Sequence, residues 1–277
     1  MKIKQILGVA ALIALCAVCL SAQAKRTITK TDRFDFGAGG TIAITGAPRG
    51  SIRVVGGQKN EIEIVATIEL QAPTEADIAK LAEITGFVTD ESAAKVSILS
   101  IGTHAKQLLK KSGKKMPKEL ANLPFNISYA ITVPRYCDLE IDGGIGDLSV
   151  ENVEGSMFVN FIETKATLML TSGTANVTIQ KGSVEASFGP RNWRGRSANV
   201  QVGQGDVLAH FPSTLSADID AIVLRTGKID NTFADLKPRD RKVQFTEKSL
   251  LAKAGVGGPP VKLGVGDGTI KMDILSH

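Results

Sequence analysis

Residues 144–150 read Gly-Ile-Gly-Asp-Leu-Ser-Val, a glycine-aspartate turn followed by a short strand with alternating apolar side chains. Similar units recur at 205–207 and 266–270. Glycine suits such turns because it adopts positive φ at little cost, and aspartate caps backbone N–H groups there. From residue 137 onward, glycines beside short strands are separated by 9, 18, 9, 23, 22 and 39 residues: Gly146, Gly155, Gly173, Gly182, Gly205, Gly227 and Gly266. Spacings near nine and near twenty predict an all-β fold, a single-stranded β-helix or β-solenoid with short strands.

Alternation of apolar and polar residues elsewhere supports this interpretation. It is clearest at 61–70 and at 125–133, where Pro134 ends the strand because proline cannot donate to a β ladder. One short helix is predicted in the N-terminal third, at 73–86, and a second short helix from about 104 to 109. An antiparallel sandwich is the competing architecture, but two-residue hairpin signals are sparse. The spacing therefore favours the solenoid.

The order of these segments resembles a family of exported adhesin-like β-solenoids, known as auto-transporter adhesin or GIN-type head domains. The resemblance is carried by a strand ending in Val-Pro at 131–134, a strand at 139–141 and the unit at 144–150. A first glycine-strand unit stands at 50–54, and the units at 205–207 and 266–270 continue the pattern. The similarity covers roughly residues 34–275 and departs at 104–123, which is basic and reads as an insertion. It implies export, a β-solenoid fold and an adhesin-like binding role.

The N-terminus has the three parts of a secretory signal peptide: Lys2 and Lys4, an apolar run over 6–20, and a small-residue site ending at Ala24. The run is shorter than the about 20 residues that a membrane-spanning helix needs. We expect cleavage after Ala24 and a periplasmic or secreted chain without a transmembrane segment. The expected organisation is a signal peptide at 1–24 and one domain at 25–277, with N-terminal strands plus helix (25–103), a basic loop insertion (104–123) and repeated coils (124–277).

Cys137 is the only cysteine left after removal of the leader, which excludes an internal disulfide. We interpret it as a small buried apolar side chain rather than a reactive thiol. The leader carries two positive charges, Lys2 and Lys4, and no negative one, so its removal lowers the formal net charge from +5 to about +3, which is modest for this length. Export and the lack of a nucleic-acid motif argue against a nucleic-acid partner.

Signals for catalysis, metal or cofactor binding are weak. The segment at 142–147 would need stacked, near-identical repeats to hold calcium, so we interpret it as a turn. The glycines at 203–205 and 264–268 precede strands rather than the helix that a phosphate loop requires. The histidines, His104, His210 and His277, form no catalytic pattern, and Asp218 with Asp220 is expected on one solvated strand face. The sequence therefore predicts a non-enzyme without cofactor or metal site.

Two basic clusters form the candidate binding surface. One lies in the insertion and the other surrounds the only tryptophan: Lys110, Lys111, Lys114 and Lys115, then Arg191, Trp193, Arg194 and Arg196. An exposed aromatic ring flanked by arginines can stack on a sugar while the arginines pair with sulfate, phosphate or uronate groups. The competing interpretations are a solvated loop for the lysines and a Trp193 ring folded back over apolar side chains.

The leading functional hypothesis is an exported, non-catalytic protein that binds or scaffolds in the bacterial cell envelope. Its expected partner is an acidic polysaccharide, a cell-wall polymer or an envelope protein. An alternative is a polysaccharide lyase or hydrolase on a β-helix, with Arg191, Arg194, Arg196 and Asp206 along a groove. A third hypothesis, a partner in envelope stress sensing, is not separated from the first by the sequence.

Overall fold

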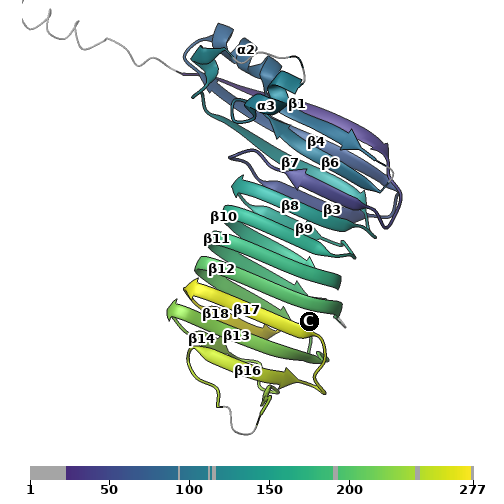
Figure 1. The fold of residues 1–277 in the computed structure, drawn as a ribbon, viewed down its shortest axis with the longest axis vertical. Helices are drawn as coiled ribbons and strands as arrows, with labels where there is room; N and C mark the ends of the chain where they lie inside the picture. Colours follow the sequence, from purple (N-terminus) through teal and green to yellow (C-terminus); the bar gives the residue numbers. More distant parts are fainter. Residues whose placement is uncertain are drawn as a thin grey trace, which may run out of the picture.

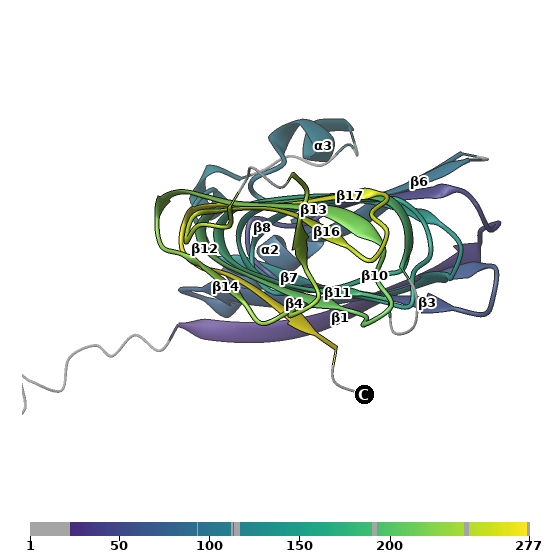
Figure 2. The same ribbon diagram turned by 90° about the horizontal axis from the view of Figure 1, so that it is seen from below.

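The chain is mostly β, as predicted, with 64% strand and 8% helix. The computed structural model describes residues 23–92, 94–111, 113, 117–189, 193–240 and 244–275, so most of the predicted leader lies outside the described residues. The strands form one large mixed sheet with both parallel and antiparallel neighbours. Figure 1 shows an elongated stack whose strands run across its long axis, and the end view in Figure 2 shows that the sheet surrounds a flattened interior. No helix among the described residues has the length and apolarity needed to cross a membrane.

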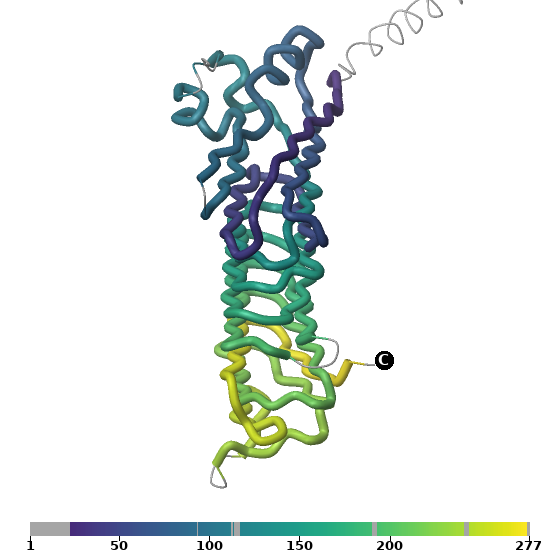
Figure 3. Tube along the Cα trace, turned by 90° about the vertical axis from the view of Figure 1, so that its right-hand side faces the viewer, coloured from purple at the N-terminus to yellow at the C-terminus, as the bar shows by residue number. Residues whose placement is uncertain are grey.

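Three long strands form the middle of the stack. The first half of each strand lies in one wall of the flattened stack and the second half lies in the opposite wall. The three strands are β10 (Met157–Leu170), β11 (Ser172–Phe188) and β12 (Arg194–Phe211). The first half of β10 pairs in parallel with β8 (Asp138–Ile145), and its second half pairs with β9 (Leu148–Glu151). We call the wall that contains β8 wall 1 and the wall that contains β9 wall 2. Figure 3 shows the successive passes of the chain lying one above another.

Toward the N-terminal end, both walls continue with strands from the first half of the chain. Wall 1 adds, in spatial order, β2 (Thr41–Thr45), β6 (Lys95–Ile101) and β5 (Gly86–Glu91). Wall 2 adds β3 (Ile52–Gly57), β7 (Phe125–Pro134), β4 (Glu61–Ala72) and β1 (Ala24–Asp35). The pairs β7–β4, β4–β1 and β6–β5 are antiparallel. Regular parallel stacking therefore gives way to hairpin-like pairing at this end.

Helices occupy the same end of the molecule (Figure 1). The helix predicted at 73–86 is α2 (Glu75–Ile84), which buries Ile78, Leu81 and Ile84 and packs against β4. Thr74 caps it, since its side chain accepts a hydrogen bond of 3.1 Å from the Asp77 backbone N–H. The second predicted helix is α3 (Lys106–Lys111), and a 3₁₀ turn follows at Lys118–Leu120.

The C-terminal strands do not follow the order of the chain. After β12 come β13 (Ala217–Thr226), β14 (Ile229–Asn231), β15 (Lys237–Pro238), β16 (Ser249–Ala254), β17 (Pro260–Asp267) and β18 (Ile270–Ile274). In space, β17 and β18 pair with β12 on one side and with β13 and β14 on the other. The last pass of the chain is therefore inserted between two earlier passes, as the yellow strands in Figure 1 show.

The interior is built from columns of apolar side chains at equivalent strand positions. One wall 1 column, at most 1% exposed throughout, consists of Ile141, Val159, Val177, Val200, Leu263 and Ala221. Burial of each Ile, Val or Leu side chain in this column stabilises the fold by roughly 1.5–3 kcal/mol. Cys137 is 2% exposed, which confirms its interpretation as a buried apolar side chain. The alternation seen in the sequence thus places its apolar members inward on both walls.

Candidate binding site

The predicted basic residues do not form one surface. Lys110 and Lys111 are exposed at the end of α3, where the neighbouring Leu109 is buried. Arg194 and Arg196 are exposed at the start of β12, much further along the stack than α3 (Figure 1). Lys114, Lys115 and Arg191 lie outside the described residues. The structure therefore separates the lysine cluster from the arginine cluster.

Trp193 is a core residue and cannot serve as a stacking platform for sugars. Its side chain is 7% exposed, and its ring meets Phe188 edge-on with centroids 5.3 Å apart. Gly195 makes room for the indole, because a Cβ there would lie 2.2 Å from ring atoms. Phe188 continues the packing with Phe211, at 4.7 Å between centroids. The ring thus folds back over apolar side chains, which confirms the competing interpretation of Trp193 and corrects its assignment to the binding surface.

Asp206 does not lie beside Arg194 and Arg196, as the lyase or hydrolase hypothesis requires. The Asp206 side chain accepts a hydrogen bond of 2.7 Å from the Thr269 backbone N–H, at the bend between the walls. Arg194 pairs with Ser172 at the opposite, starting end of β12. Asp206 therefore caps a neighbouring turn and does not face the arginine pair.

The other acidic signals are likewise part of the framework. Asp267 accepts hydrogen bonds from Arg225, which is the main reason that the pKa of this carboxyl is lowered. Asp220 forms an ion pair with Arg239. Among the described residues, no group of three His, Cys, Asp or Glu side chains is arranged to hold a metal ion.

His210 connects three strands of wall 2. Its Nδ1 lies 2.5 Å from Asp273 Oδ1 on β18, and its Nε2 lies 3.3 Å from Glu185 Oε1 on β11. The imidazole side chain is 20% exposed. The Nδ1 contact joins β12 to β18, whereas Nε2 makes no hydrogen bond within the described residues.

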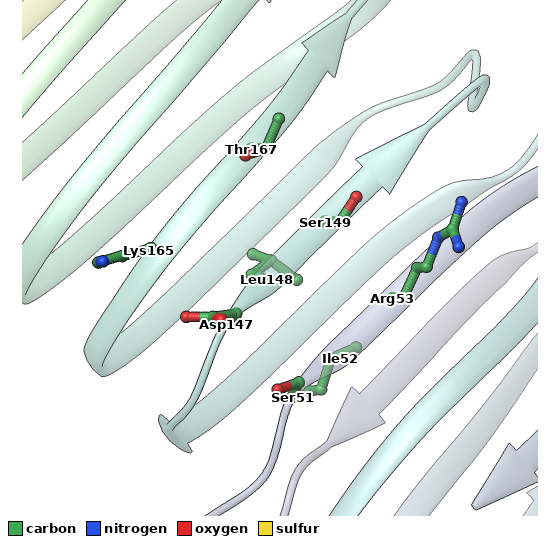
Figure 4. A pocket seen from close by; sticks show the side chains of 8 residues that line it. All are labelled: Ser51, Ile52, Arg53, Asp147, Leu148, Ser149, Lys165 and Thr167. Carbon is green, nitrogen blue, oxygen red and sulfur yellow. The ribbon is translucent and has the colours of Figure 1, made fainter.

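A shallow depression on the outside of wall 2 brings together polar residues from separate segments of the chain. It has a volume of about 360 Å³ and crosses β3, β9 and β10. Its lining is shown in Figure 4 and consists of Ser51, Ile52, Arg53, Asp147, Leu148, Ser149, Lys165 and Thr167. Ile52 and Leu148 are 1% exposed, so the polar side chains alone are offered to solvent. We call this surface the wall 2 site.

The polar groups of the wall 2 site are arranged in two rows across the strands. Arg53, Ser149 and Thr167 are in register on β3, β9 and β10. Ser51, Asp147 and Lys165 form the neighbouring row (Figure 4).

Glu151 orients the first row: Ser149 Oγ donates to its Oε1 over 3.0 Å, and Arg53 Nη2 lies 3.7 Å from the same oxygen. The side chain of Arg53 nevertheless remains 61% exposed. Hydroxyls and two cations on an open wall can bind a hydroxylated chain that carries anionic groups.

The sequence interpretation missed this site because its residues lie on strands that are not neighbours in the chain. Arg53 belongs to the 50–54 unit and Lys165 to β10, and only the β3–β9–β10 pairing joins them. Their outward positions could have been read from alternation with buried residues such as Ile52 and Ala166. That these residues lie close together could not be read from the sequence.

No protein-family model matches the chain, and no curated protein matches it. Among solved structures, it is similar to a candidate cell adhesion protein from Clostridium sporogenes, with 14% identity and a TM-score of 0.48 over 90% of this chain and 100% of that one. It is also similar to a candidate adhesin from Bacteroides fragilis, with 13% identity and a TM-score of 0.33 over 90% and 98% of the two chains. At these scores the likeness adds no argument about the site.

Proposed function

We propose that this chain is an exported, non-catalytic β-solenoid that acts as an adhesin-like binding protein of the bacterial cell envelope. The parallel passes β8–β9, β10, β11 and β12 support the solenoid description. The signal peptide pattern at 1–24 supports export. The wall 2 site supports a binding role, with an anionic polysaccharide as its ligand.

The observation that carries the proposal is that two exposed cations, Arg53 and Lys165, lie beside hydroxyls on an open wall. Asp147 lies beside Lys165 and Glu151 lies beside Arg53, so the ligand must place its anionic groups at the two cations and its hydroxyls at the carboxylates. The side chain of Arg53 is 61% exposed and Lys165 is also exposed, so both cations can meet a ligand without much desolvation. A flat wall suits an extended polymer better than a small molecule, which needs a concave pocket to bury most of its surface. Repeated weak contacts along such a polymer add up through multivalency.

Affinity electrophoresis of the mature chain in gels containing polygalacturonate or alginate tests this proposal. In the double variant Arg53→Ala/Lys165→Ala, the affinity obtained from the retardation should fall about tenfold or more, the loss expected for two charge-assisted contacts. Lys271→Ala is the matched control, because Lys271 is an exposed lysine on β18 of the same wall, outside the site. Retardation should also fall as salt rises. Equal retardation of the double variant and the control would contradict the assignment, and release of unsaturated sugars by the wild type would favour the lyase alternative.

A further inference from the structure

Wall 1 has an exposed aromatic side chain on its outer surface, outside the apolar core. Phe158 on β10 is 44% exposed, while its neighbours Met157 and Val159 are buried. Its ring therefore lies on the outer surface in the middle of the stack. Large aromatic rings are the residues that contribute most at binding surfaces when their faces are accessible.

Polar groups able to bind hydroxyls surround this ring. A depression of about 300 Å³ is lined by Glu140, Ile141, Asp142, Phe158 and Asn160, across β8 and β10. Asn160 Nδ2 donates to Asp142 Oδ1 over 3.0 Å, which fixes the two side chains relative to each other. The side-chain oxygen of Asn160, Oδ1, has no hydrogen-bond partner among the described residues, so it remains available as an acceptor. We call these five residues the Phe158 patch.

The polar character continues along the stack from the Phe158 patch. Phe158 is in register with Asn176 on β11 and then with Asn199 on β12. The parallel row starting at Asn160 continues through Thr178 to Gln201, which donates to Asn199 over 2.8 Å. Neighbouring strands are about 4.8 Å apart. Amide and hydroxyl groups therefore recur at a spacing close to the length of one sugar ring.

The charges at the Phe158 patch select against anionic ligands. Glu140 and Asp142 both lie beside the ring, and within the described part of the chain only Glu140 has a cationic partner, Lys95 at 2.6 Å. A uronate or sulfate group placed there would face the Asp142 carboxylate. A neutral pyranose has no such conflict: its C–H groups suit the negative face of the phenyl ring, and its hydroxyls can both donate and accept.

We infer that the Phe158 patch binds a neutral glycan, with Phe158 stacking on a pyranose ring and the Asn160 and Asp142 groups binding its hydroxyls. The inference rests on the proposed role as a binding protein. It uses a different wall, different residues and a ligand of different charge from the wall 2 site. The two assignments can therefore fail separately.

The test is retention of the mature chain on insoluble cellulose and chitin, with soluble cello- and chito-oligosaccharides measured by calorimetry. Phe158→Ala should lower affinity about tenfold, the size typical of losing one aromatic stacking contact. Phe158→Tyr should retain it, because the ring is kept. Ile162→Ala is the matched control, since Ile162 is 53% exposed on the same strand but lies outside the patch. Equal urea midpoints for all variants would show that the wall is intact.

Arg53→Ala/Lys165→Ala should leave neutral-glycan binding unchanged, which separates this inference from the wall 2 proposal. Absence of wild-type binding to both neutral polymers and their oligosaccharides would overturn the inference. So would wild-type affinity in Phe158→Leu, because that variant keeps an apolar side chain but lacks the ring. Equal competition by polygalacturonate would contradict the predicted preference for neutral chains.

Discussion

Gly205 is the position where a single methyl group should damage the stack most clearly. It lies at the bend of β12 with φ of +130°, in register with Gly182 of β11. A Cβ at Gly205 would lie 1.6 Å from the Gly182 carbonyl oxygen. Relief requires the two backbones to separate, because neither contacting group is a flexible side chain. Gly205→Ala therefore combines an unfavourable backbone conformation with a steric clash between passes.

The expected cost follows from these two contributions. A non-glycine residue in such a conformation costs roughly 1–3 kcal/mol. Separation of the passes also weakens neighbouring ladder hydrogen bonds, each worth about 1 kcal/mol. The reduced entropy of the unfolded chain returns about 0.4–1 kcal/mol. We expect Gly205→Ala to lower the free energy of unfolding by about 3 kcal/mol or more.

Two exposed glycines near the N-terminal end serve as controls for the separate contributions. Gly37 has no atom within 4 Å of a built Cβ and no positive φ, so Gly37→Ala should be neutral or stabilising by about 0.4–1 kcal/mol. Gly39 has φ of +87° and equally open space, so Gly39→Ala should cost about 1–2 kcal/mol from backbone conformation alone.

Urea unfolding followed by Trp193 fluorescence measures all three variants, provided that the slopes are equal. The reasoning is refuted if Gly205→Ala is as stable as Gly37→Ala. It is also refuted if Gly205→Ala costs no more than Gly39→Ala, because the clash between passes would then contribute nothing.

Three further predictions concern buried side chains. Trp193→Ala should lower the free energy of unfolding by about 3–5 kcal/mol through loss of a core aromatic, whereas the adjacent exposed Arg194→Ala should change it by less than about 0.5 kcal/mol; similar urea midpoints would show that the indole is not packed. Burial raises the pKa of Cys137 to about 12, so iodoacetamide at pH 8 should label the unfolded chain but not the native one, and rapid native labelling would disprove the burial. Burial also raises the pKa of Tyr129 to about 12, against the smaller opposing effect of its 2.7 Å hydrogen bond with Ser100. The unfolded chain releases this proton near pH 10 while the folded chain keeps it, so stability should fall as the pH rises from about 10 to 12; an increase in the urea midpoint over that range would contradict the sign.

The sequence predicted the local features of the fold and missed the pairing between distant segments. The alternation at 125–133 became β7, and the helix predicted at 73–86 became α2, because both depend on residues close together in the chain. The outward position of Phe158 was also readable, since the residues on either side of it are apolar and buried. Trp193 was misassigned because its burial depends on Phe188 from the preceding pass. The sequence allowed a ring folded back over apolar side chains as the competing interpretation, but it did not identify Phe188 as the contact.

The same limit explains why the ends of the stack differ from a simple repeat. In the series of glycines beside short strands, the longest interval, 39 residues from Gly227 to Gly266, is the irregularity that marks the C-terminal rearrangement. The excursion through β15 and β16 occupies that gap. The glycine spacing indicates that the chain leaves the regular stack, but it does not indicate which strands β17 and β18 pair with. Parallel pairing can join any two strands with compatible faces, so the insertion of β17 and β18 could not be derived.

The insertion of β17 and β18 also decides which strand lies at the C-terminal edge of wall 1. Among the described residues, β13 pairs with β17 and with β16, and it has no pairing with β12. β17 lies between β13 and β12. On its other side, β13 is covered by β16, an antiparallel strand that breaks the parallel pattern. An open parallel edge would invite another copy to add on. In this chain, β17 and β18 instead lie within the array, and the short antiparallel strands β16 and β15 cover the edge of β13 in wall 1.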